Sequence, residues 1–179
     1  MKLIIPMAGM GTRMRPHTLN TPKPLLKLAG KSIVERIVED LIKFTGKNID
    51  EIHYVIGNFG EDVVKSLLEI ASRNGASGKI HYQDQALGTA HAIFCAKDAL
   101  KGEVIISFAD TLFIGDLKID DQEAIIWTKD VENPENYGVV VCDKKGIISD
   151  FVEKPKDFIS RNAIIGIYYF REGQQLRNE

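Results

Sequence analysis

The sequence predicts an α/β fold: a mainly parallel, Rossmann-like sheet with helices on both faces, followed by a strand-rich part. Up to about residue 115, short apolar runs typical of buried strands alternate with segments whose apolar residues recur at helical spacing. Such alternation produces parallel strands joined by right-handed helical crossovers. After residue 115 the strand patterns follow one another without helices between them, which predicts a distinct second part over residues 116–179.

The elements of the first part follow from their local patterns. Its predicted strands are residues 3–7, 52–56, 79–83 and 104–108, and its predicted helices begin near residues 32, 61 and 89. Ser32 and Glu35 form a capping box before an apolar stripe at helical spacing, and Gly46 ends that helix. The third helix is expected to extend to about Leu100, before Gly102.

The second part is predicted to consist of strands joined by turns. Its strands are expected at residues 124–128, 138–142, 147–152 and 164–170. The sequence Asp143-Lys144-Lys145-Gly146 between the second and third of these strands is typical of a hairpin loop. Asn133-Pro134-Glu135-Asn136 is typical of a turn.

Composition and charge restrict the class of protein. With 179 residues, 44% hydrophobic and 27% charged, the chain has the size and composition of one globular domain. A net charge of −2 provides no bulk attraction for nucleic acid or a membrane surface. No apolar run approaches transmembrane length, and the run after Lys2 is too short for a signal peptide. We therefore expect a cytoplasmic protein in which Cys95 and Cys142, both in apolar segments, are reduced core residues.

The most informative stretch is residues 3–26, LIIPMAGMGTRMRPHTLNTPKPLL. A short apolar run there breaks into a loop with two glycines, which is followed by Arg13, Arg15 and Lys23. Glycine lets the backbone approach a ligand that any Cβ would push away, and arginine and lysine neutralise phosphate charge. The alternative is a tight turn without a ligand. We favour a triphosphate cradle, because three cations crowded into one loop repel each other unless an anion joins them.

Spacing excludes two better-known glycine loops. Gly11 is followed by Thr12 and Arg13, whereas a Walker A loop requires Lys and then Ser or Thr after its second glycine. A dinucleotide fingerprint requires a third glycine at the position that Met14 occupies. A Rossmann-type oxidoreductase is therefore excluded.

The loop contains Gly9-Met10-Gly11-Thr12-Arg13, then Pro16, Thr18 and Pro22-Lys23-Pro24-Leu25. These residues and their spacing resemble the signature of sugar-1-phosphate nucleotidylyltransferases, and the resemblance extends over essentially the whole chain. It implies a reaction in which an NTP and a sugar 1-phosphate give an NDP-sugar and pyrophosphate. It favours dTTP or UTP with glucose 1-phosphate, and a mannose-1-phosphate guanylyltransferase is the close alternative.

The resemblance also implies which residues act. Arg13 would stabilise the leaving pyrophosphate, Lys23 would contact the phosphates near the reacting centre, and Asp110 would hold Mg²⁺. Gln83 would read the base, because a side-chain amide offers both a donor and an acceptor. The residues expected to bind the nucleotide are Ala8, Gly9, Gly11, Thr12, Arg13, Gln83, Gly88 and Thr89. Those expected to bind the sugar phosphate are Tyr137, Gly138, Glu153 and Lys154.

Taken without the resemblance, several of these residues have a plainer interpretation. Asp110 would be a turn or helix-cap residue, Gln83 a solvated residue at a strand end, and Glu153-Lys154 a surface pair beside a turn. The predicted phosphate cradle favours the functional interpretation of Asp110, which lies, like Gln83, at the carboxyl edge where ligands of parallel sheets bind. The histidines have no ligand-like spacing and are expected to be structural or solvated. They are His17, His53, His81 and His91.

One departure from the family leaves a second function open. The second metal-binding Asp of the family lies beyond residue 179, so we expect the chain to be either a truncated part of the catalytic domain or a short variant of it. The alternative function is a non-catalytic module that binds a nucleotide or sugar phosphate and regulates a partner. Retention of Arg13, Lys23 and Asp110 favours the enzyme. A sheet edge left open by missing strands would favour a homo-oligomer.

Overall fold

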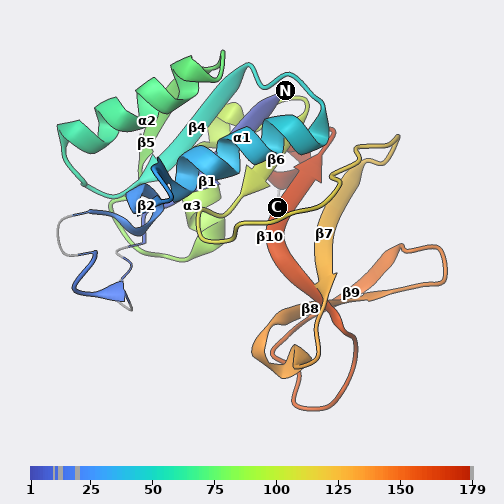
Figure 1. Cartoon of the computed structure of the whole chain (residues 1–179). Helices are drawn as coiled ribbons and strands as arrows, with labels where there is room; N and C mark the ends of the chain where they lie inside the picture. The colour runs from blue at the N-terminus through green and yellow to red at the C-terminus, as the bar shows by residue number, and fades with distance from the viewer. Residues whose placement is uncertain (10, 12–13, 19–20, 178–179) are drawn as a thin grey trace. The chain divides into compact units, whose positions relative to one another are not determined.

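The computed structural model describes residues 1–9, 11, 14–18 and 21–177, and its helices and strands are drawn in Figure 1. The chain forms two compact units, one made of residues 1–125 with the segment from Tyr168 onward, the other of residues 126–167. We predicted a division at residue 115. In the structure the last segment returns to the first unit, where the Gly173 amide donates to the Gly102 carbonyl oxygen at 2.9 Å.

A parallel sheet forms the centre of the first unit. Its strands are β1 (Lys2–Pro6), β4 (Glu51–Ile56), β5 (Ser77–Tyr82) and β6 (Val104–Ser107), in the order β5-β4-β1-β6. All three pairings are parallel, and β1 lies between β4 and β6, with Leu3 opposite both Ile52 and Ile105. The predicted parallel sheet is therefore confirmed, and its carboxyl ends share one edge.

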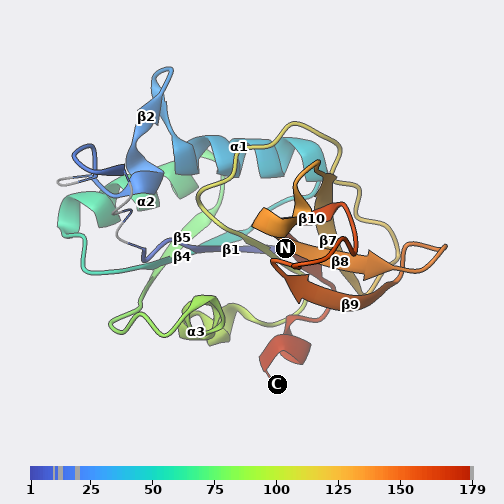
Figure 2. The same cartoon turned by 90° about the horizontal axis from the view of Figure 1, so that it is seen from below.

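Helices cover both faces of this sheet. Helices α1 (Ile33–Thr45) and α2 (Glu61–Arg73) lie on one face and α3 (Thr89–Cys95) on the other, as Figure 2 shows. Apolar residues of β1, β4 and β6 pack against α3. Those fully or nearly fully buried there include Ile4, Val55, Ala92, Ala96 and Ile106. Because side chains alternate along a strand, Ile5, Tyr54 and Ser107 lie on the opposite face.

The ends of the helices follow the predicted signals, with two differences. The Glu35 amide donates to Ser32 Oγ at 3.2 Å, and Gly46 ends α1 in the left-handed conformation with φ 61°. The Glu35 carboxylate does not complete a capping box, because it pairs with Arg73 of α2 at 3.0 Å. Helix α3 ends at Cys95, before the predicted Leu100, and is followed by the 3₁₀ turn η3 (Lys97–Ala99).

Three short elements order the long connection between β1 and α1. They are the 3₁₀ turn η2 (Lys23–Leu25) and the two-stranded ribbon of β2 (Lys27–Leu28) and β3 (Lys31–Ser32). Pro24 is buried, and η2 lies against α1. The connection therefore places Lys23 in a defined turn rather than in an open loop.

Antiparallel strands form the second unit. They are β7 (Ala124–Asp130), β8 (Gly138–Cys142), β9 (Ile148–Glu153) and β10 (Asn162–Phe170), with the 3₁₀ turn η4 (Pro134–Asn136) before β8. The first two residues of β7 and the last three of β10 belong to the first unit. Strand β8 pairs with β9 and with β10, and β7 pairs with β10. Asp143 Oδ1 accepts hydrogen bonds from the Lys145 and Ile147 amides at 2.8 and 2.9 Å. These bonds explain the predicted hairpin loop between β8 and β9.

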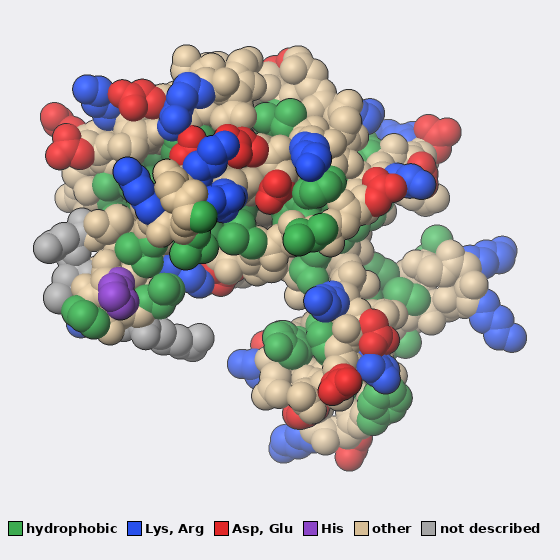
Figure 3. Space-filling view, in the orientation of Figure 1, with side chains coloured by type: hydrophobic (Ala, Val, Ile, Leu, Met, Phe, Trp, Pro, Cys, Tyr) green, Lys and Arg blue, Asp and Glu red, His purple; other side chains and the backbone are tan. Residues whose placement is uncertain are grey.

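Charges of both signs mix on the surface of the first unit (Figure 3), and the two cysteines are not fully buried. On the face of the first unit seen in Figure 3, Lys and Arg side chains are interspersed with Asp and Glu side chains. Cys95 and Cys142 are free and only partly buried, so neither is a fully buried core residue. No helix in the described part of the chain is both long and apolar enough to cross a membrane.

Candidate active site

A cavity of about 570 Å³ opens at the carboxyl edge of the parallel sheet in the first unit. This volume is within the range of small-molecule binding pockets. Three segments that are distant in the sequence contribute its walls: the loop after β1 with η2, the loop between β5 and α3, and the residues after β6. The lining residues are Pro6, Met7, Ala8, Gly9, Gly11, Met14, Lys23, Pro24, Gln83, Ala86, Gly88, Thr89, Ala92, Phe108, Ala109 and Asp110.

The predicted residues of the first unit gather in this cavity. Ala8, Gly9, Gly11, Lys23, Gln83, Gly88, Thr89 and Asp110 all line it. Thr12 and Arg13 lie outside the described residues, so their positions remain predictions. The sequence did not single out the apolar walls formed by Met14, Ala86 and Phe108, because apolar residues in loops carry no local signal of their partners.

Gly11 is required where the loop turns back toward Lys23. Its φ is +56°, and a Cβ at this position would lie 3.0 Å from Lys23 Cβ and 3.2 Å from Thr18 Cγ2. Thr18 Oγ1 donates a hydrogen bond of 2.8 Å to the Gly11 carbonyl oxygen, which closes this part of the loop. We interpreted the glycine as room for a ligand. The structure adds a second reason, since any side chain would push against the base of the Lys23 side chain.

Lys23 and Asp110 form the charged centre of the cavity. Lys23 Nζ lies 3.6 Å from Asp110 Oδ2, and the Thr111 hydroxyl donates to Asp110 Oδ1 at 3.3 Å. The side chains of Lys23 and Asp110 are 30% and 58% exposed, so a ligand from solvent can reach both. An exposed pair of this kind contributes little to stability, about 0–1 kcal/mol. Its position in the cavity therefore suggests a role in binding rather than in folding.

Asp110 also fits the requirements of a magnesium ligand. Among the described residues, no group of three or more His, Cys, Asp and Glu side chains could hold a metal ion. Mg²⁺, however, commonly takes one or two carboxylates and completes its octahedral shell with water and phosphate oxygens. Asp110, exposed in a cavity with Lys23, is compatible with a metal that arrives together with a phosphate ligand.

Gln83 is held by two internal contacts in the wall that the loop between β5 and α3 contributes. Its Nε2 donates to the Gly88 carbonyl oxygen at 3.1 Å and lies 3.0 Å from His91 Nδ1. Gly88 has φ +99° and precedes Thr89, the first residue of α3. We expected His91 to be structural or solvated, and the structure places it beside the predicted base-reading residue. In the sequence, the only indication that His91 lies near the site was its position in the first turn of α3, just after Gly88.

The predicted sugar-phosphate residues gather within the second unit. Gly138 of β8 stands opposite Glu153 of β9, and a Cβ on Gly138 would lie 2.8 Å from Glu153 Oε2. The Lys154 amide donates to the Tyr137 carbonyl oxygen at 3.0 Å, and Lys154 Nζ lies 3.8 Å from Glu153 Oε1. Lys154 adopts a φ of 46°, in the left-handed region that non-glycine residues seldom occupy. These four residues therefore form one polar cluster.

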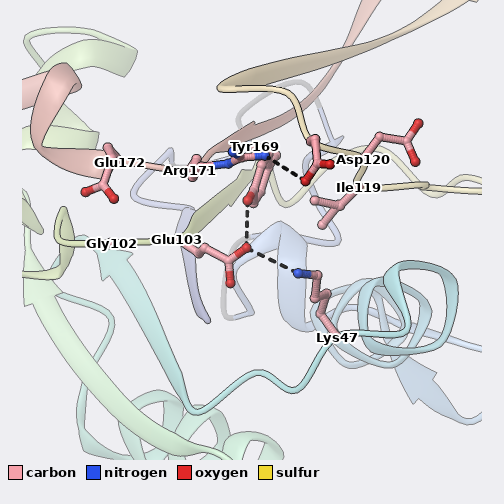
Figure 4. Close-up of a pocket in the computed structure, with 9 residues that line it drawn as sticks. Lys47, Gly102, Glu103, Ile119, Asp120, Tyr169, Arg171 and Glu172 are labelled. Carbon is pink, nitrogen blue, oxygen red and sulfur yellow. Dashed lines mark hydrogen bonds and ion pairs between the residues drawn. The ribbon is translucent and has the colours of Figure 1, made fainter.

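A second cavity of the first unit, of about 670 Å³, has a different character (Figure 4). Glu103 accepts hydrogen bonds there from the Tyr169 hydroxyl at 2.7 Å and from Lys47 at 3.2 Å. The Tyr169 hydrogen bond lowers the pKa of Glu103, and burial raises the pKa of Tyr169 to about 12. Acidic residues outnumber basic ones in its lining, and Lys47 is already paired. The smaller cavity, whose described lining holds one lysine and one aspartate, therefore suits an anionic ligand better.

Comparisons with curated proteins show the family to which the chain is related. The nucleotidyl transferase family model matches residues 2–177. The chain is 34% identical over 173 residues to the bifunctional protein GlmU of Methanococcus maripaludis, covering 94% of the chain and 39% of that relative. It is 31% identical over 179 residues to the mannose-1-phosphate guanylyltransferase catalytic subunit beta of Drosophila melanogaster, covering 94% and 48%. The chain thus spans less than half the length of either relative.

A comparison with solved structures supports the fold. The chain superposes with a TM-score of 0.84 on a Bacillus anthracis protein assigned as a glucose-1-phosphate thymidylyltransferase and crystallised with sucrose. The two are 26% identical, and the match covers 98% of this chain and 73% of the other. This likeness confirms the predicted α/β fold with its mainly parallel, Rossmann-like sheet.

Proposed function

The chain belongs to the nucleotidyl transferase family, and on that premise we propose that it transfers a nucleotidyl group from an NTP to a sugar 1-phosphate. The products are an NDP-sugar and pyrophosphate. One observation carries the proposal: Lys23, Asp110 and Gln83, from three separate segments, line one cavity at the carboxyl edge of the parallel sheet. A cation, a metal-binding carboxylate and an amide suit the phosphates, the metal and the base of one nucleotide.

The proposed reaction is an in-line displacement at the α-phosphorus of the NTP. A phosphate oxygen of the sugar 1-phosphate forms the new P–O bond, and the bond to the β-phosphate breaks, so pyrophosphate leaves with the electron pair. Such a step depends on positioning and charge neutralisation more than on covalent catalysis. Lys23 would hold the phosphates at the reacting centre, and Arg13 would stabilise the leaving pyrophosphate. Mg²⁺ bound at Asp110 would neutralise charge on the phosphate oxygens.

The sugar phosphate would be bound by the polar cluster of the second unit. Glu153 can accept hydrogen bonds from sugar hydroxyls, the Gly138 amide can donate one, and Lys154 can contact the phosphate as a point charge. Tyr137, whose side chain is 47% exposed, offers a ring face to the sugar. Glucose 1-phosphate is the favoured substrate.

The favoured nucleotides are dTTP and UTP, with GTP as the alternative. The Gln83 amide can pair with the edge of thymine or uracil, and it can pair with guanine as well. Similarity to a mannose-1-phosphate guanylyltransferase at 31% identity keeps the pair of GTP and mannose 1-phosphate in consideration. We further propose that the protein acts in the cytoplasm, on small molecules rather than on nucleic acid or membranes, and as a homo-oligomer.

The test is to measure pyrophosphate release from a panel of NTPs, each combined with glucose 1-phosphate or mannose 1-phosphate, in the presence of Mg²⁺. Release that requires one NTP and one sugar phosphate together would support the proposal. Isothermal titration with the same nucleotides distinguishes the second candidate, a regulatory module. Binding of a nucleotide without pyrophosphate release, under any combination, would favour that module instead.

A further inference from the structure

The amide of Gln83 is fixed in one orientation by its protein contacts. Its Nε2 lies 3.1 Å from the Gly88 carbonyl oxygen and 3.0 Å from His91 Nδ1, and the contact to His91 is partly buried. A carbonyl oxygen can only accept, so the amide group facing Gly88 must be the NH₂. His91 Nδ1 accepts the second amide hydrogen when the ring proton is on Nε2. Both hydrogens of the Gln83 amide are then used inside the protein.

The atom of Gln83 left for a ligand is therefore the acceptor Oε1. Gln83 is one of the described residues that line the cavity, and His91 is not. His91 therefore contacts the site through Gln83. We propose that His91 is a positioning residue that holds the Gln83 amide with its oxygen toward the base and thereby restricts which bases bind. This inference rests on the proposed function of the cavity as a nucleotide site.

An acceptor at this position distinguishes two classes of base. Thymine and uracil carry a ring N–H at N3, and guanine carries one at N1, so each can donate to Oε1. Cytosine N3 and adenine N1 are acceptors, so a base of this class bound in the same position would face the oxygen with a lone pair and would have to shift to offer its amino group instead. A buried polar group left without its partner is costly, so the site should reject the second class. UTP against CTP, and GTP against ATP, are thus matched pairs that differ in the atom facing Gln83.

Removal of the His91 acceptor would release this restriction. In His91→Phe the ring shape remains, but the Gly88 carbonyl oxygen alone then holds the amide, which can rotate about that hydrogen bond and turn its second N–H toward the ligand. The amide of Gln83 could then present a donor to the base, and cytosine and adenine would no longer be excluded. In His91→Asn the side-chain oxygen lies near the position of Nδ1 and can accept the same hydrogen. The conservative variant should therefore restore what the phenylalanine variant loses.

The experiment compares the wild type, His91→Phe and His91→Asn by titration of UTP, CTP, GTP and ATP and by kcat and KM for each nucleotide. Thermal unfolding of the three proteins shows whether they are folded. The wild type should prefer one member of a matched pair. His91→Phe should reduce that preference about tenfold, through KM more than through kcat, and His91→Asn should recover most of it.

Two outcomes would overturn the inference, and a third would overturn the function on which it rests. An active wild type whose preference is unchanged in His91→Phe excludes a positioning role. Equal losses for all four nucleotides in both folded variants would assign His91 a purely structural role. A folded wild type that neither binds nor turns over any NTP would contradict the proposed function itself.

Discussion

At the scale of single residues, the cavity depends on a small number of specific contacts. The Lys23 side chain lies beside Gly11 and Asp110, and each of these neighbours affects a different part of it. Gly11 leaves space for the Lys23 stem, while Asp110 supplies a counter-charge at 3.6 Å. The ammonium group therefore already faces the cavity beside a counter-charge before any phosphate binds, and charge that is placed in advance is the kind that favours catalysis.

Replacing Lys23 with Ala should lower kcat about a hundredfold, corresponding to about 3 kcal/mol of transition-state stabilisation. The reason is that the phosphates at the reacting centre would lose their fixed positive charge. Pyrophosphate release at saturating NTP and sugar phosphate measures the effect. Lys27→Ala is the matched control, because Lys27 is exposed on β2 and outside the cavity lining. Near-full turnover of Lys23→Ala would exclude the proposed role.

Two hydroxyls of the core lack hydrogen-bond partners within the described structure. They belong to Tyr54 and Ser107, which lie on the same face of the sheet. Burial alone raises the pKa of Tyr54. A buried hydroxyl that loses water without gaining a partner opposes folding.

Replacing Tyr54 with Phe should therefore stabilise the protein by about 1 kcal/mol, since it removes a desolvated group and keeps the ring. Urea unfolding monitored by circular dichroism measures the change. Tyr169→Phe is the opposite control. The Tyr169 hydroxyl donates to Glu103 at 2.7 Å, so its removal should destabilise. A Tyr54→Phe protein less stable than the wild type would point to a buried water as the missing partner.

At the scale of elements, strands β4 and β5 are joined by a pair of histidines in addition to their backbone bonds. His53 Nδ1 lies 2.9 Å from His81 Nε2, and His53 Nε2 lies 3.2 Å from Glu51. Desolvation by burial lowers the pKa of both histidines below the ordinary value of 6.5. Lys79 also contributes to the lowering for His81. The contacts between the two strands therefore favour the uncharged form of the His53 and His81 rings.

This arrangement predicts that the free energy of unfolding falls as the pH is lowered from 7 to 5. The unfolded chain binds more protons than the folded one in this window. The stabilisation is therefore fully present above pH 6.5 and is lost as the pH falls through the folded-state pKa values. Urea unfolding at several pH values measures the slope. Keeping the pH above 5 separates the effect from titration of Glu51, whose pKa is lowered from 4.5.

The double variant His53→Asn with His81→Asn is the control for this prediction. Because asparagine does not titrate, its free energy of unfolding should vary less between pH 7 and 5. An unchanged slope would assign the pH dependence to groups elsewhere in the chain.

At the scale of the whole molecule, binding of a nucleotide should raise the thermal stability. A ligand present at about 100 times its Kd stabilises the folded state by about 2.7 kcal/mol. Part of that effect should require Mg²⁺, because Asp110 can hold the metal only together with phosphate oxygens. Differential scanning fluorimetry with the nucleotide, with and without EDTA, measures the two parts.

The variant Asp110→Asn should lose the Mg²⁺-dependent part of this thermal shift. Asp116→Asn is the matched control, since Asp116 is exposed beside Lys118 and lies outside the cavity lining. Equal Mg²⁺ dependence in the two variants would place the metal elsewhere.

Much of the fold could be predicted because its signals are local. Alternating strands and helices, the Ser32 cap and Gly46 are properties of neighbouring residues, and each is confirmed. The fit of Gly11 against Lys23 and the contact of His91 with Gln83 depend on segments brought together only by folding. The same holds for the boundary between the units, because the segment from Tyr168 onward returns to strands far earlier in the chain.

The pairing of Lys23 with Asp110 has a consequence for ligand selection. Each side chain is the other's counter-ion, so a bare anion must draw the lysine away from the carboxylate and leave that carboxylate uncompensated. A chelate of magnesium and nucleotide brings both signs of charge at once, and each side chain exchanges one partner for another. We therefore expect the resting site to discriminate against inorganic phosphate and uncomplexed nucleotide before any chemistry begins.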